Sequence, residues 1–160
     1  MAGTMLLSGS SELSVDEKGR FAMPARCRQP LSEHCGGVLV FTRSLTDRCL
    51  WIYPQKEWEE TVSALGALPS VTDALCRTVQ RVVLGSAVSL KPDSQWRYVL
   101  PPELREAAGL KGRAMLIGFN RKFELWSCEE LEAQRRRDEE LLKRSLGSFG
   151  DHQGLGDLRL

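Results

Sequence analysis

Histidine and paired cysteine, which most often build metal sites, are scarce in this 160-residue sequence. It has two histidines, His34 and His152, and its five cysteines contain no C-x-x-C pair. An odd number of cysteines without paired spacing argues against a disulfide framework. A structural zinc ion takes about four protein ligands, and the sequence has no cysteine pair spaced to supply two of them together. We therefore expect no metal site and no cofactor.

Catalytic motifs are missing as well. The sequence contains no G-x-S-x-G, no H-E-x-x-H, no phosphate-cradling G-x-x-x-x-G-K and no glycine-rich dinucleotide fingerprint. A nucleophile needs an adjacent base. Cys27 and His34 lie near each other in sequence, but that proximity does not establish the geometry. The sequence therefore predicts a protein that is not an enzyme and has no small-molecule substrate.

Long apolar runs and an excess of one charge are also lacking. No run approaches the roughly 20 residues of a membrane helix, and residues 1–11 lack a basic region followed by a long apolar core. We therefore expect a cytoplasmic protein without membrane contact. Since 22 basic residues balance 21 acidic ones, any nucleic-acid binding must come from a local patch.

What the sequence does contain is a repeat. Residues 16–28 recur in their spacing as residues 93–105: an Asp, an Arg four residues later, an apolar strand, a Pro and another Arg. The offset is 77 residues, as Asp16 and Asp93 show (93 − 16). Each copy reads as strand, turn, strand, short helix, strand, loop, strand and longer helix. Because a repeated unit need not bury its apolar face alone, we expect two interlocked copies.

The segment between the first two strands of the first copy predicts a hairpin turn. Gly19 suits a position of positive φ, and Asp16 can accept hydrogen bonds from backbone N–H groups two residues further on. Arg20 leaves the turn close enough to Asp16 for an ion pair. This pair either only clamps the hairpin, or it also presents Lys18 and Arg20 to DNA at a protruding tip. Both interpretations can hold together.

These blocks carry a resemblance to a known family. Residues 14–20 and 23–28 resemble the first repeat of the MraZ family of transcriptional regulators, and the resemblance extends over roughly residues 9–130. Further blocks support it, at residues 49–54, 57–59, 81–87, 100–105 and 122–126.

The resemblance implies an α+β fold, mainly β with short helices. Two tandem AbrB-like swapped-hairpin modules would form one pseudo-twofold barrel-like unit, with a helical hairpin between them and a C-terminal helix. We expect the modules at residues 9–57 and 86–129, the hairpin at 58–85, the C-terminal helix at 130–146 and a flexible tail at 147–160.

The resemblance also implies a function. It predicts a sequence-specific regulator that binds double-stranded DNA at promoter direct repeats, upstream of the division and cell-wall gene cluster that includes its own gene. It further predicts a homo-oligomer in the form of a ring, in the cytoplasm and associated with the nucleoid. An AbrB-fold antitoxin-like regulator with a protein partner is the alternative, although such antitoxins usually carry one module. A purely structural assembly protein is a third possibility.

The candidate DNA contacts follow from the repeat. The first copy contributes four basic residues and the second copy two weaker ones, namely Lys18, Arg20, Arg26 and Arg28, then Arg97 and Arg105. Asp16, Gly19 and Asp93 are expected to structure the two turns.

The second copy ranks lower because Trp96 stands in its turn where the first copy has Gly19. A bulky residue at positive φ costs on the order of 1 kcal/mol or more, so we expect this turn to change type. Pro30 stands where the second copy has Ala107, and we expect it to end the short helix of the first copy early.

Two basic clusters remain open to more than one interpretation. Arg77 and Arg81 lie on one side of a predicted helix, where they form either a solvated face or a subunit contact with acidic residues such as Glu57, Glu59 or Glu60. Residues 135–137 are three arginines among acidic neighbours, which indicates a solvated charged helix.

Overall fold

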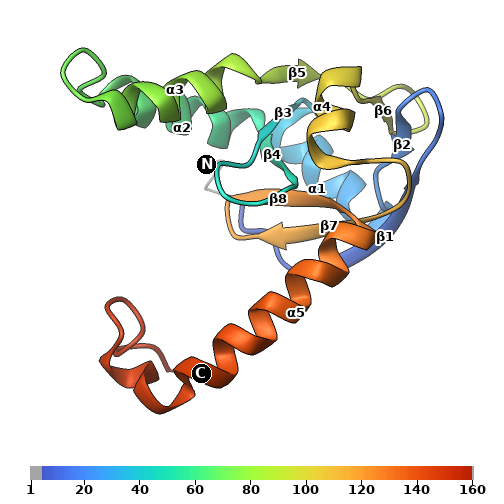
Figure 1. The fold of residues 1–160 in the computed structure, drawn as a ribbon. Helices are drawn as coiled ribbons and strands as arrows, with labels where there is room; N and C mark the ends of the chain where they lie inside the picture. Colours follow the sequence, from blue (N-terminus) through green and yellow to red (C-terminus); the bar gives the residue numbers. More distant parts are fainter. Residues whose placement is uncertain (1–4, 160) are drawn as a thin grey trace. The chain divides into compact units, whose positions relative to one another are not determined.

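The computed structural model describes residues 5–159 of the chain. These fall into two compact units with the boundary after Cys128 (Figure 1). The second unit consists mainly of α5 (Cys128–Ser145) and the short 3-10 helix η1 (Leu146–Asp151). The first unit contains both copies of the repeat and all the strands.

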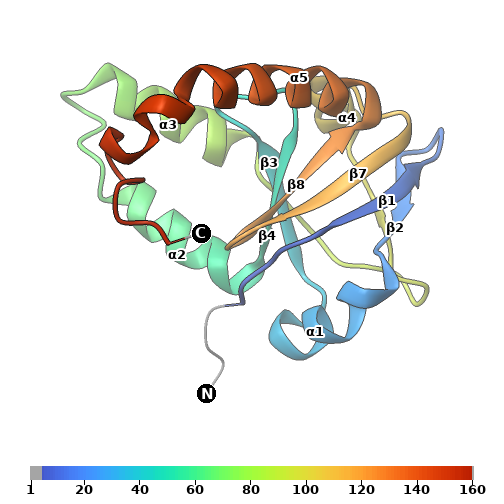
Figure 2. The same ribbon diagram turned by 90° about the horizontal axis from the view of Figure 1, so that it is seen from below.

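Each copy of the repeat supplies four strands and one helix. The first copy forms β1 (Ser10–Val15), β2 (Arg20–Ala22), α1 (Ala25–Cys35), β3 (Leu39–Arg43) and β4 (Leu50–Pro54). The second forms β5 (Val88–Leu90), β6 (Arg97–Val99), α4 (Pro102–Ala108), β7 (Gly112–Phe119) and β8 (Lys122–Ser127). Between them lie α2 (Gln55–Gly66) and α3 (Ala74–Gly85). In both views this helical hairpin lies at the end of the unit opposite β2 (Figures 1 and 2).

The two copies exchange strands. The large sheet has the order β1-β7-β8-β4-β3-β5, and every pairing in it is antiparallel. If each strand is replaced by its counterpart in the other copy, the same order is read backwards, which is the topology of a pseudo-twofold unit. Each first strand therefore pairs with the third strand of the other copy. This confirms the expected α+β class with two interlocked modules.

The second strands of the two copies form a sheet of their own. In this β2–β6 ladder, Phe21 lies opposite its counterpart Tyr98. Their rings stack at 5.6 Å between centroids, and the Phe41 ring packs against both. All three side chains are buried in the main core. The Tyr98 hydroxyl donates to the Gly37 carbonyl at 2.6 Å, which satisfies a polar group that would otherwise destabilise the core.

Pro30 does not end the first short helix, contrary to the expectation from the sequence. Helix α1 continues through it to Cys35. Cys27 and Leu31 are both buried and lie one turn apart on either side of the proline, while Pro30 itself is exposed. Burial of these two side chains holds the helix in place across the missing hydrogen bond, because tertiary packing can outweigh an intrinsic preference.

Polar contacts hold the helical hairpin to strand β3 and to helix α1. Thr42 donates its hydroxyl to the Val83 carbonyl at 2.6 Å. Glu57 is only 3% exposed and hydrogen-bonds the His34 Nε2 at 2.8 Å. Of the acidic residues considered for a subunit contact, Glu57 is therefore engaged inside the chain, and Glu60 pairs with Arg121.

Part of the hairpin's apolar surface is left uncovered. Val83 and Trp58 are buried against Val40 and Tyr53, but Leu75 is 72% exposed.

Among residues 5–159, no helix combines the length and the apolar character needed to cross a membrane. The same residues contain no cluster of three or more His, Cys, Asp or Glu that could hold a metal ion.

Candidate nucleic-acid interface

The first turn (residues 16–19, between β1 and β2) is organised by a single carboxylate. Asp16 Oδ1 accepts hydrogen bonds from the backbone N–H groups of Lys18 at 2.9 Å and Arg20 at 2.8 Å. Its Oδ2 accepts from Arg20 Nε at 2.8 Å. Gly19 has a φ of 83° and donates its N–H to the Asp16 carbonyl. The carboxylate thus fixes both the backbone of the turn and the direction of the Arg20 side chain.

The second turn (residues 93–96, between β5 and β6) has the same hydrogen bonds. Asp93 Oδ1 accepts from the backbone N–H groups of Gln95 at 2.8 Å and Arg97 at 2.9 Å, and Oδ2 accepts from Arg97 Nε at 2.8 Å. The Trp96 N–H donates to the Asp93 carbonyl at 3.0 Å, the same distance as in the first turn. The expected change of turn type is therefore wrong.

Trp96 takes the left-handed conformation itself, with a φ of 60°. Its indole packs against the main core and over Gly37, where an added Cβ would lie 2.9 Å from Trp96 Cζ3. Burial of a large aromatic surface offsets the roughly 1 kcal/mol of backbone strain. Sequence reasoning weighed the strain and missed the space that Gly37 provides.

Both arginines lie on the outward face of the β2–β6 ladder. Phe21 and Tyr98 point inward, whereas Arg20 and Arg97 flank the ladder at opposite ends, opposite Val99 and Ala22 respectively. The two arginine side chains are 41% and 42% exposed. In the part of the chain that the structure describes, each guanidinium uses only its Nε for a protein partner. Their other N–H groups are therefore available to an anionic ligand.

The clamps also tune the two carboxylates. The backbone N–H of Arg20, followed by its guanidinium, lowers the pKa of Asp16 below the usual range. The N–H and guanidinium of Arg97 do the same to the pKa of Asp93. Both carboxylates therefore stay ionised at neutral pH and partly cancel the charge of their arginines. Lys18 is exposed at the tip of the first turn, with no ion pair inside the described range, and adds a positive charge that the second turn lacks.

Arg26 and Arg28 are partly committed to the protein. Arg26 donates Nε to the Ser11 hydroxyl at 2.7 Å and lies exposed near the start of α1. Arg28 donates Nε to the Met23 carbonyl at 2.8 Å. Each guanidinium keeps further N–H groups that can bind a ligand, but its position is fixed by its hydrogen bond to the protein. In the second copy, the position of Arg26 is taken by Glu103.

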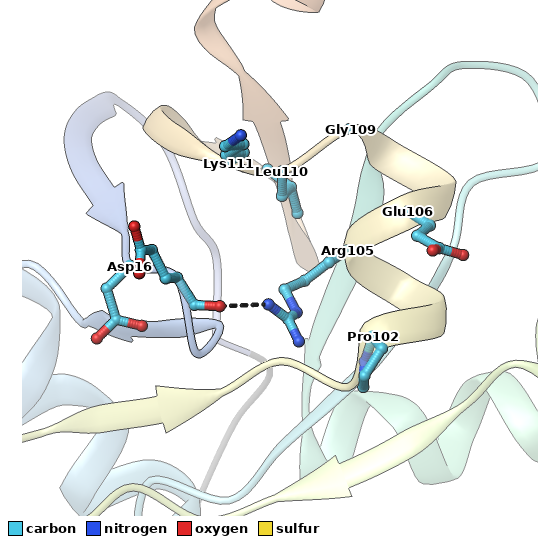
Figure 3. Close-up of a pocket in the computed structure, with 8 residues that line it drawn as sticks. Asp16, Pro102, Arg105, Glu106, Gly109, Leu110 and Lys111 are labelled. Atoms are coloured by element: carbon cyan, nitrogen blue, oxygen red, sulfur yellow. Dashed lines mark hydrogen bonds between the residues drawn. The ribbon is translucent and has the colours of Figure 1, made fainter.

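Arg105 comes from the second copy but lies beside the first turn. Its guanidinium donates to the Glu17 carbonyl at 3.0 Å (Figure 3). A pocket of about 610 Å³ opens between the first turn and α4, lined by Asp16, Glu17, Pro102, Arg105, Glu106, Gly109, Leu110 and Lys111. The exchange of strands brings these two segments together. Because they lie far apart in the sequence, the contact between Arg105 and Glu17 could not be predicted from sequence spacing. Lys111, a base that sequence reasoning did not select, also borders this pocket.

The two turns therefore differ in charge. Residues 16–28 contain four basic and two acidic side chains, a net charge of +2, whereas residues 93–105 contain two of each and are neutral. Arg105 and Lys111 also lie beside the first turn, together with the acidic Glu106. A basic tip with free N–H groups can bind phosphate and base edges.

The Cys–His combination in α1 does not resemble a catalytic pair. Burial raises the pKa of the Cys27 thiol, which disfavours the nucleophilic thiolate. The His34 Nε2 is engaged by Glu57.

Comparison with known proteins gives a consistent match on both copies. A family model described as "MraZ protein, putative antitoxin-like" matches residues 6–82 and again residues 83–145. The chain is 43% identical over 124 residues to the transcriptional regulator MraZ of Saccharophagus degradans, covering 78% of this chain and 84% of that protein. It is 44% identical over 133 residues to the MraZ of Pseudomonas putida F1 (83% and 87%), and 40% identical over 142 residues to that of Pseudomonas aeruginosa LESB58 (89% and 93%).

Proposed function

Since this chain belongs to the MraZ family of transcriptional regulators, we propose that it binds specific DNA mainly through its first turn. The observation that carries DNA binding is the pair of matching Asp–Arg clamps, each of which places an arginine on the outward face of the β2–β6 ladder, and Lys18 favours the first turn. Such an arginine presents a planar fork of donors to a guanine edge or a phosphate. We propose residues 9–57 and 86–129 as the two DNA-binding modules, joined by residues 58–85.

We assign unequal roles to the candidate residues. Lys18 and Arg20 make the principal contacts, and Arg97 makes a weaker one, because the second turn has no base at its tip. Arg26, Arg28 and Arg105 have part of their donors bound to the protein. These three arginines contribute to DNA binding by orienting the turns and by adding positive charge.

A nearly neutral chain needs several turns acting together. One first-turn segment carries a net charge of only +2, but phosphate contacts made by several subunits on one duplex add together. We propose a homo-oligomer, in ring form, whose subunits meet through apolar surface such as the exposed Leu75. Light scattering coupled to gel filtration should give a mass several times 17.9 kDa. A clean monomer at micromolar concentration would remove this avidity.

The target that we propose is a set of direct repeats upstream of the division and cell-wall gene cluster, including the gene for this protein. The regulator would then act in the cytoplasm, at the nucleoid. The test is a mobility shift with DNA upstream of its own gene, competed by unrelated DNA. Retardation that survives the competitor supports the proposal. Equal competition by both DNAs would contradict sequence-specific binding.

An antitoxin-like regulator with a protein partner is the second candidate, and the description of the matching family favours it. Two complete clamps in one chain favour DNA binding as the common activity, since such antitoxins usually carry one module. A stable complex with a co-expressed neighbouring gene product, which relieves that product's toxicity, would favour this candidate.

A further inference from the structure

The space beside the first turn is filled by a side chain from the other copy. A Cβ added to Gly19 would lie 2.8 Å from Arg105 Nε and 2.9 Å from its Cδ. The Arg105 side chain therefore passes directly over the glycine, in contact with the backbone of the turn. The absence of a side chain at residue 19 is what allows this approach, in addition to permitting the positive φ.

Arg105 also holds the tip by a hydrogen bond. It donates to the Glu17 carbonyl at 3.0 Å (Figure 3), and its Nε is buried with no hydrogen-bond partner among residues 5–159. Its helix is firmly anchored, because Leu104 and Ala108 are buried in the main core. The guanidinium is thus a brace between a rigid helix and the turn that carries Lys18.

The corresponding residue of the first copy does something different. Arg28 donates Nε to the Met23 carbonyl of its own copy. No bond from Arg28 to the second turn occurs within residues 5–159, and the space beside that turn is occupied by Trp96 packed over Gly37. The brace therefore exists only at the first turn, and Arg28 provides a matched control within the same chain.

We propose that Arg105 is a positioning residue for DNA recognition, which acts through the first turn and makes no principal contact with DNA. The inference rests on the proposed function, since it assumes that the tip with Lys18 is the DNA contact. Holding the tip before binding reduces the ordering that DNA binding would otherwise require. The second copy thereby controls the affinity of the first copy's turn.

Hydrogen–deuterium exchange of the free protein tests the brace without DNA. Arg105→Ala should speed exchange in a peptide covering residues 15–21 by about two- to tenfold, as expected for the loss of one hydrogen bond. Exchange in residues 92–98 should not change, and Arg28→Ala should leave residues 15–21 as in the wild type. Arg105→Met, which keeps an apolar stem over Gly19, carries the same test if Arg105→Ala folds poorly. Unchanged exchange at the first turn in folded Arg105→Met overturns the inference.

A double-mutant cycle tests how Arg105 affects DNA binding. If it acts through the tip, Arg105→Ala should weaken binding by at least about twofold per engaged turn, and this loss should shrink in a Lys18→Ala background. The loss should persist in an Arg97→Ala background, because independent effects multiply. Equal losses in all three backgrounds would overturn the inference.

Arg105→Lys separates the brace from a direct phosphate contact. Lysine keeps the charge but lacks the planar fork, so we expect it to bind DNA less well than the wild type. If it binds as the wild type does, and Arg105→Ala lowers the salt slope by about 0.9 per contact, Arg105 touches phosphate and the inference is wrong. Faster exchange at the first turn with unaltered DNA binding would instead support the brace and contradict the proposed role of the tip.

Discussion

The first and second turns of this protein share every hydrogen bond of the Asp–Arg clamp but differ in what lies beside them. Beside Gly19 of the first turn lies Arg105, and beside Gly37 lies Trp96 of the second turn. In the first turn the small residue belongs to the turn and its large neighbour to the other copy, whereas in the second turn the large residue belongs to the turn and its small neighbour to the other copy. The backbone of the turn is therefore specified by the aspartate and the arginine, and the glycine is dispensable where a large side chain finds burial.

The comparison separates the fold from the binding surface. Both clamps keep the β2–β6 ladder symmetrical, with Phe21 facing Tyr98. The first turn adds Lys18 at its tip and a brace from Arg105, and the second turn has neither. A duplicated unit can thus preserve its structural half in both copies while concentrating charge in one.

The largest effect should come from the two clamp arginines. We expect Arg20→Ala to weaken binding to the target DNA far more than Arg97→Ala does. A lost base contact costs about 1–3 kcal/mol, and an oligomer repeats the loss at every engaged turn. Mobility shifts at several salt concentrations measure both the affinity and the number of phosphate contacts.

Arg20→Ala also releases Asp16, so a melting curve and the oligomeric mass must accompany the binding data. Arg97→Ala releases Asp93 in the same way and serves as the matched control for any loss of stability. If Arg20→Ala keeps its fold and mass and still binds like the wild type, the first tip is structural and the site assignment is wrong.

A second, smaller effect is the loss of stability when the space beside Trp96 is filled. Gly36 and Gly37 both have positive φ, but only Gly37 is crowded: an added Cβ would lie 2.9 Å from Pro92 Cγ and from Trp96 Cζ3. Gly36→Ala should cost about 1 kcal/mol of backbone strain. Gly37→Ala should cost about 1–3 kcal/mol more through overpacking. Chemical denaturation of both variants measures the difference, and equal losses would show that the indole can move aside.

Much of this architecture was predictable because it follows from regular spacings in the sequence. The 77-residue offset predicted two interlocked copies, and the Asp-x-x-x-Arg spacing predicted the clamp. The paired residues of each clamp lie four positions apart, and the repeat shows as one constant offset, so both can be read along the chain without knowledge of the strand pairing. The expectation that Pro30 would end α1 failed because the burial of Leu31, a tertiary contact, keeps the helix intact.

What could not be predicted depends on the exchange of strands. The offset revealed that Arg105 corresponds to Arg28, but not that Arg105 would lie beside the first turn. Similarly, Trp96 looked strained because its compensating neighbour, Gly37, belongs to the other copy. Contacts between copies require knowledge of the pairing, and one sequence read along its length does not supply it.

Trp96→Gly should have a modest effect on stability. The change removes backbone strain of about 1 kcal/mol, but it loses a partly buried indole, and full burial of a large apolar side chain stabilises by about 1.5–3 kcal/mol. We expect a net loss of about 1 kcal/mol in the free energy of unfolding, measured by chemical denaturation. In a Gly37→Ala background the loss should be smaller, because the overpacking is relieved. Strict additivity of the two changes would contradict the packing of Trp96 over Gly37.

The smallest expected effect is on carboxyl pKa values, which should distinguish the two Asp–Arg clamps from an ordinary helix cap. Asp73 caps α3, and its pKa is lowered by the backbone N–H groups of Cys76 and Leu75 without any arginine. The pKa values of Asp16 and Asp93 are lowered by an arginine N–H and by its guanidinium. A lowered carboxyl pKa in the folded state gives stability that is present above the unfolded value of about 3.9 and is lost as pH falls through the folded value. Both clamps should therefore loosen together in acid, below about pH 4. Carboxyl carbon NMR should follow all three titrations. Because salt screens exposed charges, added salt should raise the pKa of Asp16 and Asp93 more than that of Asp73.

A normal pKa for Asp93 beside a low one for Asp16 would show that Trp96 weakens the second clamp. The two turns would then differ in their hydrogen bonds as well as in their neighbours.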